Sequence, residues 1–337
     1  MSGFKREIKL FDAVMIVAGT MIGSGIFIVS ADIARTVGSP GYLILVWLIT
    51  GIITLIGATS YAELAGMMPK AGGQYIYLRE AYNPLVSFLY GWTLFGVIQT
   101  GTIAAVAVAF AKYSGVLIPW FSETNYLVDL GVLKFSTVQL LAISSIVLLT
   151  WLNGRGVKNG KLIQNIFGST KIIAIIILIV LGFAIGMNAD AILANFSNMW
   201  EAKKVVIKDG AIFSTESIMG FGIVVAIGLA MIGSLFSSDA WNNISFAGDE
   251  VVNPSKTLVR SLAIGTGLVT LIYILVNFVY LMVLPLNDIQ TAPFDRVAAG
   301  AANSFGGTTA VIAISVLIMI STFGCNNGCI LDRKSVV

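Results

Sequence analysis

Long apolar stretches alternate with short polar connections along this chain of 337 residues. A helix needs about 20 mostly apolar residues to cross a bilayer, so each long stretch predicts a membrane span. The segment 172–186 is the clearest example, because none of its side chains is polar. The pattern predicts eight spans, at residues 10–37, 42–68, 85–117, 136–153, 163–187, 217–249, 257–285 and 306–331.

The longer connections between these spans differ in character. Residues 70–83 combine aromatic and charged side chains and predict a short interfacial helix. Residues 287–304 predict a short helix over the outer end of the bundle. Residues 188–216 form the most polar connection, and we expect them to be the most mobile loop.

Composition supports an all-α integral membrane protein. Hydrophobic residues make up 57% of the chain and charged residues 11%, whereas a soluble domain carries about 25% charged residues. So little charge cannot cover a water-exposed surface, and a bundle of many spans packs as one unit. We therefore expect a single transmembrane domain over residues 1–337.

The residue types that are missing exclude several function classes. The sequence has no histidine, which removes histidine proton relays, histidine metal ligands and Ser-His or Cys-His catalysis. The two cysteines, Cys325 and Cys329, are four residues apart and lack disulfide spacing on a helix. Basic residues are scattered singly, unlike a nucleic-acid-binding surface. We expect no enzyme, metal, cofactor or nucleic-acid partner.

Lysine and arginine placement predicts the orientation in the membrane. With a cytoplasmic N-terminus, twelve of these residues lie in inner connections and seven in outer ones. Inner loops carry the excess of positive charge in multi-pass proteins. The sequence therefore predicts a multi-pass protein of the inner or plasma membrane with its N-terminus inside.

The first span is interrupted near its middle by Gly23-Ser24-Gly25. One interpretation is close helix packing, in which Gly19 and Gly23 form a small-residue contact. The other is unwound backbone, which survives at membrane depth only if it faces protein or a water-filled cavity. Such a break exposes N–H groups and the positive end of a half-helix, which suit a carboxylate.

The sixth span contains a second interruption, the polar run 232–243. Its Asp239 would cost about 2.5–3.5 kcal/mol at the centre of a helix in lipid. An interrupted span at a similar place in each half of a chain indicates the binding site of a transporter. The two breaks together favour a site over simple packing.

Four further charged residues are candidates for a functional role. Lys171 precedes the longest apolar run, where it either reaches the interface or binds the carbonyls of the first break in place of a sodium ion. Glu63 and Glu250 lie at inner ends of spans, and each is either a carboxylate that reaches the interface or pairs in a gate, which we favour, or a substrate ligand. Arg155 is a candidate gate partner for them.

Several short motifs occur in one order along the chain. They are Gly23-Ser24-Gly25, Tyr61-Ala62-Glu63-Leu64, Pro69 to Tyr75, Asn153 to Lys158, Phe236 followed by Trp241-Asn242, and Gly324 to Gly328. In this order the motifs resemble the amino acid–polyamine–organocation superfamily. Within it, the chain is most similar to the L-type amino acid transporter family and its bacterial serine/threonine and alanine–serine–cysteine exchangers. The resemblance runs from about Phe11 to Ile330.

The resemblance implies a LeuT-like helix bundle built from two inverted repeats. The first repeat is expected at about 10–187 and an incomplete second repeat at about 217–331, with helices one and six discontinuous. Members of the family usually have about twelve spans, of which eight are expected here. Residues 332–337 do not continue the pattern of the last span, and we expect a C-terminally truncated chain.

The resemblance also implies which residues bind the substrate. The substrate carboxylate is expected at the first break, at Ile22, Gly23, Ser24 and Gly25. The α-amine is expected at the carbonyls of Ser237, Ser238 and Asp239. Phe236 matches an aromatic residue that covers the substrate, and Trp241 and Asn242 match residues near the side-chain pocket.

The resemblance assigns Lys171 to the position that sodium occupies in other members. Ser321 and Cys325 fall where helix eight faces this lysine, although many relatives have serine at the position of Cys325. The implied function is sodium-independent exchange of neutral L-amino acids by alternating access. The alternatives are a proton-coupled amino acid symporter, with Lys171 or Glu63 as coupling group, and an inactive truncated fragment. A partner subunit is neither indicated nor excluded.

Overall fold

The computed structural model describes residues 6–69, 72–131, 134–154, 160–208 and 210–332. Most of these residues are helical. The helices are α1 Leu10–Met21, α2 Gly25–Val37, α3 Pro40–Met67, α4 Gly73–Ala81, α5 Pro84–Thr93, a π-helical turn Leu94–Ile98, α6 Gln99–Leu117, α7 Thr137–Gly154, α8 Gly160–Ala184, α9 Ala189–Ser197, α10 Phe221–Ser237, a 3-10 helix Trp241–Glu250, α11 Pro254–Val283, α12 Leu286–Gln290, a 3-10 turn Pro293–Asp295 and α13 Val297–Asp332. The strands are β1 Tyr126–Asp129, β2 Lys134–Ser136, β3 Lys203–Lys208 and β4 Ala211–Ser217.

Every one of the eight predicted spans coincides with helix in the structure. Among the described residues, five helices are long and apolar enough to cross a membrane alone, and two bent pairs raise the number to seven. The remaining predicted span, α7, is shorter. The protein is therefore a multi-pass helical membrane protein, and α13 begins earlier than predicted because it continues through a bend at Gly307.

Proline and glycine explain where several helices begin and end. Pro40, Pro84 and Pro254 each occupy the first turn of a long helix, where proline lacks only an N–H that has no helical partner. Gly38 adopts a left-handed conformation with φ of 53° and ends α2. These positions separate consecutive spans with very short connections.

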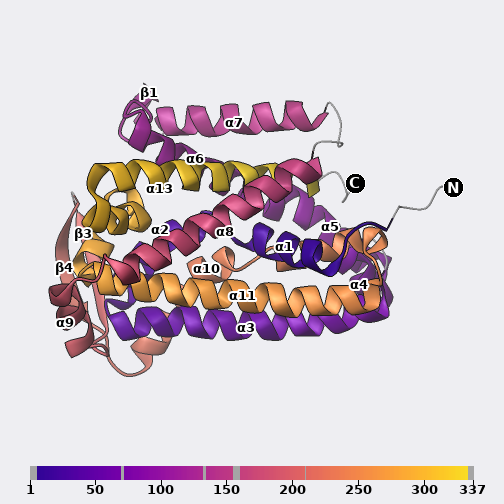
Figure 1. The fold of residues 1–337 in the computed structure, drawn as a ribbon, viewed down its shortest axis with the longest axis horizontal. Helices are drawn as coiled ribbons and strands as arrows, with labels where there is room; N and C mark the ends of the chain where they lie inside the picture. The colour runs from indigo at the N-terminus through magenta and orange to yellow at the C-terminus, as the bar shows by residue number, and fades with distance from the viewer. Residues whose placement is uncertain (1–5, 70–71, 132–133, 155–159, 209, 333–337) are drawn as a thin grey trace.

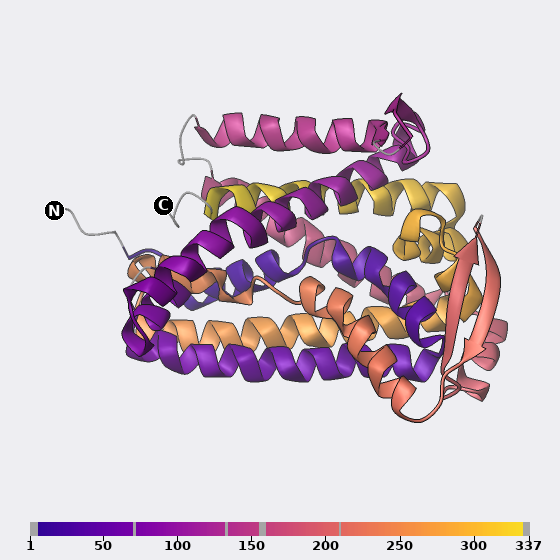
Figure 2. The same cartoon turned by 180° about the vertical axis from the view of Figure 1, so that it is seen from behind.

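The helices run along the long axis of the molecule, and α3 and α11 lie side by side (Figures 1 and 2). Helix α7 forms one edge of the bundle beyond α6 and α13 (Figure 1). The continuous apolar core surrounds α1 and α2, which α11 contacts along much of its length. The interrupted first span thus lies inside the protein rather than at its lipid-facing surface.

The two ends of the bundle carry different structures. Helix α4, which confirms the predicted short helix in 70–83, lies at the same end as the start of α1 (Figure 1). Both β-hairpins and α9 lie at the opposite end. We refer to the end with the hairpins as the hairpin end.

Two predicted connections differ from the structure. Residues 188–216 are not an irregular loop, because they contain α9 and the antiparallel hairpin β3–β4, with Lys203 opposite Ser217. Residues 287–304 do not form one helix. They contain the end of α12, a 3-10 turn and the start of α13, because Phe294 and Asp295 adopt left-handed backbone conformations that interrupt it.

Candidate functional site

The first span is broken, as the glycines predict. Helix α1 ends at Met21, α2 begins at Gly25, and their axes differ by 43°. Within the described chain, the N–H groups of Gly23 and Ser24 donate to no backbone or side-chain oxygen. The first N–H groups of a helix also lack partners inside it, so the start of α2 presents a cluster of free donors.

Lys171 occupies the other side of this break. Its side chain is 1% exposed, and its Nζ donates to the carbonyl of Gly19 at 2.5 Å and of Ile22 at 3.0 Å. The last carbonyls of α1 have no helical partners and form the negative end of the helix dipole. The ammonium therefore neutralises the end of α1, which excludes the interpretation that Lys171 reaches the membrane interface.

The second break follows α10. Ser237 is its last residue, Ala240 adopts a left-handed conformation with φ of 67°, and a 3-10 helix follows from Trp241. Ser237 and Ser238 are buried, whereas Asp239 is exposed within the described protein. The polar run 232–243 thus ends a helix in the middle of the sixth span, as predicted.

The structure brings the two breaks into direct contact. A Cβ atom added to Gly25 would lie 2.0 Å from Oγ of Ser237, so only glycine allows α2 to approach α10 this closely. The hydroxyl of Thr20 donates to the carbonyl of Ala240 at 3.0 Å. Close helix packing therefore occurs at Gly25, which also begins a half-helix, rather than at Gly23.

A tyrosine from a third helix joins both breaks. The Tyr273 hydroxyl in α11 lies 3.0 Å from the carbonyl of Met21 and 3.0 Å from that of Ser237. One O–H is shared between the ends of α1 and α10. The sequence analysis missed this residue, because a single tyrosine in an apolar span has many possible partners.

Tyr273 belongs to a polar stripe on α11. Asn277 accepts a hydrogen bond from Ser30 at 2.6 Å, and Tyr280 donates to the carbonyl of Ile26 at 3.2 Å. Residues four and three apart share one face of a helix, and all three polar side chains are buried. This spacing within an apolar span is the signal that could have identified the stripe.

Replacing Tyr273 with phenylalanine tests the link between the breaks. Side-chain hydrogen bonds in membranes contribute about 0.6 kcal/mol on average and at most about 1.7 kcal/mol. We expect Tyr273→Phe to lower stability by about 0.6–1.7 kcal/mol, measured by thermal denaturation in detergent. Tyr280→Phe is the control with one bond to α2 alone, and an equal loss in both variants would contradict a special role for Tyr273.

Two cavities lie beside the second break. One, of about 430 Å³, is lined by Ile53, Thr54, Gly57, Leu235, Phe236, Ser238, Asp239 and Trp241. The other, of about 210 Å³, is lined by Gln74, Tyr90, Leu94, Ile98, Gln99, Thr102, Asp239, Ala240, Asn242, Asn243, Phe246 and Cys329. Asp239 lies on the wall of both, whereas Ile22–Gly25 line neither.

The aromatic residues around the second break face α3. Phe236 is 46% exposed and borders the larger cavity. Trp241 packs edge-on against Tyr61, with ring centroids 5.0 Å apart. Asn242 borders the smaller cavity. These predicted residues are therefore grouped around the break, but they divide between the two cavities.

Helix α13 faces the first break. A Cβ atom on Gly23 would lie 3.7 Å from Sγ of Cys325. Ser321 is fully buried, and its hydroxyl has no hydrogen-bond partner among the residues that the structure describes. Among the described contacts, Lys171 bonds to the backbone of the first span and not to Ser321 or Cys325.

The structure says little about the three predicted gate residues, Glu63, Arg155 and Glu250. Glu63 and Glu250 are both exposed, and no ion pair joins either of them to another described residue. Arg155 lies outside the described residues. The predicted gate pairing therefore stays a prediction.

Known proteins with similar sequences cover almost the whole chain. Serine/threonine exchanger SteT of Bacillus subtilis (strain 168) is 31% identical over 335 residues, which cover 99% of this chain and 68% of that protein. Large neutral amino acids transporter small subunit 2 of Mus musculus is 32% identical over 324 residues, covering 96% of this chain and 56% of that protein.

A third relative, b(0,+)-type amino acid transporter 1 of Mus musculus, is 29% identical over 327 residues. The alignment covers 97% of this chain, and the chain spans 61% of the relative's length. Residues 8–333 match the family described as Amino acid permease. The chain therefore belongs to the amino acid permease family of the amino acid–polyamine–organocation superfamily, whose members are transporters rather than enzymes.

Proposed function

We propose that this protein exchanges neutral L-amino acids across a membrane without sodium, by alternating access. The observation that carries the proposal is the Lys171 ammonium on the carbonyls of Gly19 and Ile22. A fixed cation at the end of α1 leaves no need for a bound sodium ion there. Two relatives, a serine/threonine exchanger and a large neutral amino acid transporter, agree with this proposal.

The two breaks supply complementary groups for an amino acid. The free N–H donors at Gly23 and Ser24 and the start of α2 suit the carboxylate. The carbonyls of Ser237, Ser238 and Asp239 suit the α-amine. The Tyr273 hydroxyl donates to the carbonyl of Ser237 in the present conformation, and the second lone pair of that oxygen can still accept from the amine.

Neutral side chains fit the surroundings of the second break. Ser237, Ser238 and Ala240 are small, and Asp239 is the one charged residue among those that line the two cavities. A cationic substrate would need more negative charge, and an acidic substrate would meet Asp239 directly. Phe236 is placed to cover a substrate on the side of α3, and Trp241 and Asn242 to limit its side chain.

The proposed architecture is a pair of inverted repeats within one domain, at about 10–187 and 217–331. A discontinuous helix early in each repeat, α1–α2 and α10 with its 3-10 helix, supports this proposal. The excess of basic residues in the connections that share the N-terminal side of the predicted topology supports a cytoplasmic N-terminus in a plasma or inner membrane. In this proposed orientation the hairpin end faces outward.

Transport by purified protein in proteoliposomes tests the proposal. We expect uptake of radiolabelled serine or alanine to rise about tenfold or more when the vesicles contain unlabelled substrate. Replacement of sodium by potassium should leave this uptake unchanged. Uptake that requires a sodium gradient, or that follows a proton gradient without internal amino acid, would contradict sodium-independent exchange, and the latter result would support symport.

A further inference from the structure

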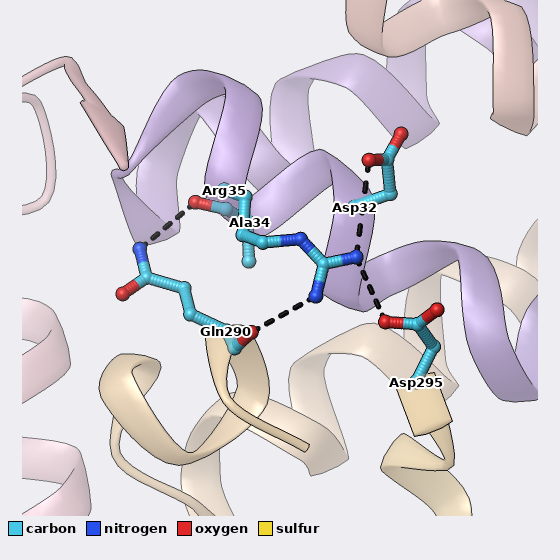
Figure 3. Close-up of polar contacts among 5 residues, drawn as sticks. All are labelled: Asp32, Ala34, Arg35, Gln290 and Asp295. Atoms are coloured by element: carbon cyan, nitrogen blue, oxygen red, sulfur yellow. Dashed lines mark hydrogen bonds and ion pairs between the residues drawn. The ribbon is translucent and has the colours of Figure 1, made fainter. Parts of the chain in front are cut away.

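A polar cluster at the hairpin end joins the first span to the connection between α11 and α13. Arg35, in the last turn of α2, donates through Nη1 to the carbonyl of Gln290 at 3.0 Å and through Nη2 to Asp295 at 2.8 Å. Gln290 donates back to the carbonyl of Ala34 at 2.9 Å. Figure 3 shows the guanidinium between these groups.

The cluster joins two elements that are distant in sequence. Gln290 is 2% exposed, whereas the side chains of Arg35 and Asp295 are 22% and 36% exposed, so water competes weakly for the bonds of Gln290 and more strongly for the ion pair. Charge-assisted hydrogen bonds of this kind are the stronger class in proteins. The contacts therefore hold the outer end of α2 against α12 and the following turn.

The turn that supplies Asp295 is strained. Phe294 and Asp295 have φ of 55° and 63°, a region that residues with a Cβ atom rarely adopt. Such backbone persists only where surrounding contacts fix it. Here the bond from Asp295 to Arg35 is one such contact, and its loss would let the turn relax.

We propose that Arg35, Gln290 and Asp295 form a latch that holds the hairpin end of the protein closed. The inference rests on the proposed transport function, in which α2 must separate from neighbouring elements to admit substrate from that side. When the hydrogen bonds of the latch break, the end of α2 is released and the strained turn at Phe294 and Asp295 relaxes at the same time. The latch thereby sets the population of the state that is open at the hairpin end.

Asp32 provides a matched control for the substitutions at Arg35 and Asp295. Asp32 also lies near the Arg35 guanidinium, at 3.9 Å, but it belongs to α2 itself and its side chain is 66% exposed. Asp32→Asn removes the same charge next to the same arginine without breaking a contact between elements. It should leave the latch closed, whereas Asp295→Asn and Arg35→Gln should open it.

Amide hydrogen exchange measures the latch directly. We expect amides in 288–296 to exchange about tenfold faster in Asp295→Asn and Arg35→Gln than in the parent, and at the parental rate in Asp32→Asn. Arg35→Lys keeps a cation that can still donate to Asp295, and we expect its amides to exchange more slowly than those of Arg35→Gln. Unchanged exchange in Asp295→Asn and Arg35→Gln would overturn the latch, and the order of Arg35→Lys and Arg35→Gln decides the matter if Asp295→Asn folds poorly.

The role of the latch in transport needs a second measurement. A larger open population lowers the apparent KM for amino acid supplied at the hairpin end, since apparent affinity follows the competent fraction. We expect the KM to fall about threefold or more in Asp295→Asn, whereas general damage would raise it. Faster amide exchange with an unchanged or higher KM would overturn the gating role, and a parent that transports no amino acid would contradict the proposed function alone.

Discussion

Lys171→Met is expected to abolish amino acid exchange. The substitution keeps an unbranched side chain one atom shorter than lysine but leaves the carbonyls of Gly19 and Ile22 without their donor inside the protein. An unsatisfied buried polar group costs about 1–3 kcal/mol, and the end of α1 also loses its neutralising charge. We expect exchange in proteoliposomes to fall about a hundredfold, equivalent to about 2.7 kcal/mol.

Lys112→Met is the matched control for this experiment. Lys112 lies near the hairpin end of α6 and pairs with Glu123 at 3.0 Å, in a partly exposed ion pair. Ion pairs near the surface contribute about 0–1 kcal/mol, so this variant should exchange at nearly the parental rate. Parental exchange in Lys171→Met, or equal losses in the two variants, would show that the ammonium at the first break has no special role.

Gly25→Ala is expected to prevent the two breaks from meeting. The new methyl group would lie 2.0 Å from Oγ, 2.5 Å from Cβ and 3.1 Å from Cα of Ser237, so the helices must move apart. Overpacking a filled interior costs about 1–3 kcal/mol or more. We expect a lower yield of monodisperse protein in size-exclusion chromatography and loss of radiolabelled alanine binding.

Gly23→Ala separates this steric effect from substrate binding. Its methyl group would meet Cys325 Sγ at 3.7 Å, an ordinary contact, so the variant should fold like the parent. If the substrate carboxylate lies at Gly23, this variant should still bind alanine more weakly. Adding Ser237→Gly to Gly25→Ala removes the clashing atoms and should recover yield; a failure to recover would place the defect elsewhere.

The two breaks could be predicted from the sequence because the residues that cause each break are neighbours in the chain. Glycines around Ser24 weaken a helix wherever they occur, and Asp239 is too polar for a regular span in lipid. For Lys171, the sequence left two interpretations open, one at the membrane interface and one at the carbonyls of the first break. Its carbonyl partners lie about 150 residues away in the chain, and no spacing rule links such distant positions.

Contacts between distant elements account for what sequence reasoning missed. Tyr273 joins the ends of α1 and α10, which are separated by more than 200 residues. The sequence identified Arg35 only as a basic residue in an outer connection, because its hydrogen bonds depend on how the connection after α11 folds. A polar residue in a span indicates a buried partner but does not identify it.

The hairpin β3–β4 was missed for another reason. A search for long apolar windows detects spans and treats every polar connection alike. Yet Asp209-Gly210 is a strong hairpin signal between two segments rich in β-branched residues. This signal predicts the hairpin, and β3 and β4 do pair on either side of Gly210, with a shift of register between Val206 and Ile207.

Competition binding with substrate analogues tests the central claim most directly, namely that one amino acid bridges the two breaks. Against radiolabelled L-alanine bound to the purified protein, L-alaninamide lacks the carboxylate and N-acetyl-L-alanine lacks the charged amine. If the first break binds the carboxylate and the second binds the amine, each analogue should compete about a hundredfold more weakly than L-alanine. Competition by either analogue as strong as that of L-alanine would contradict the account.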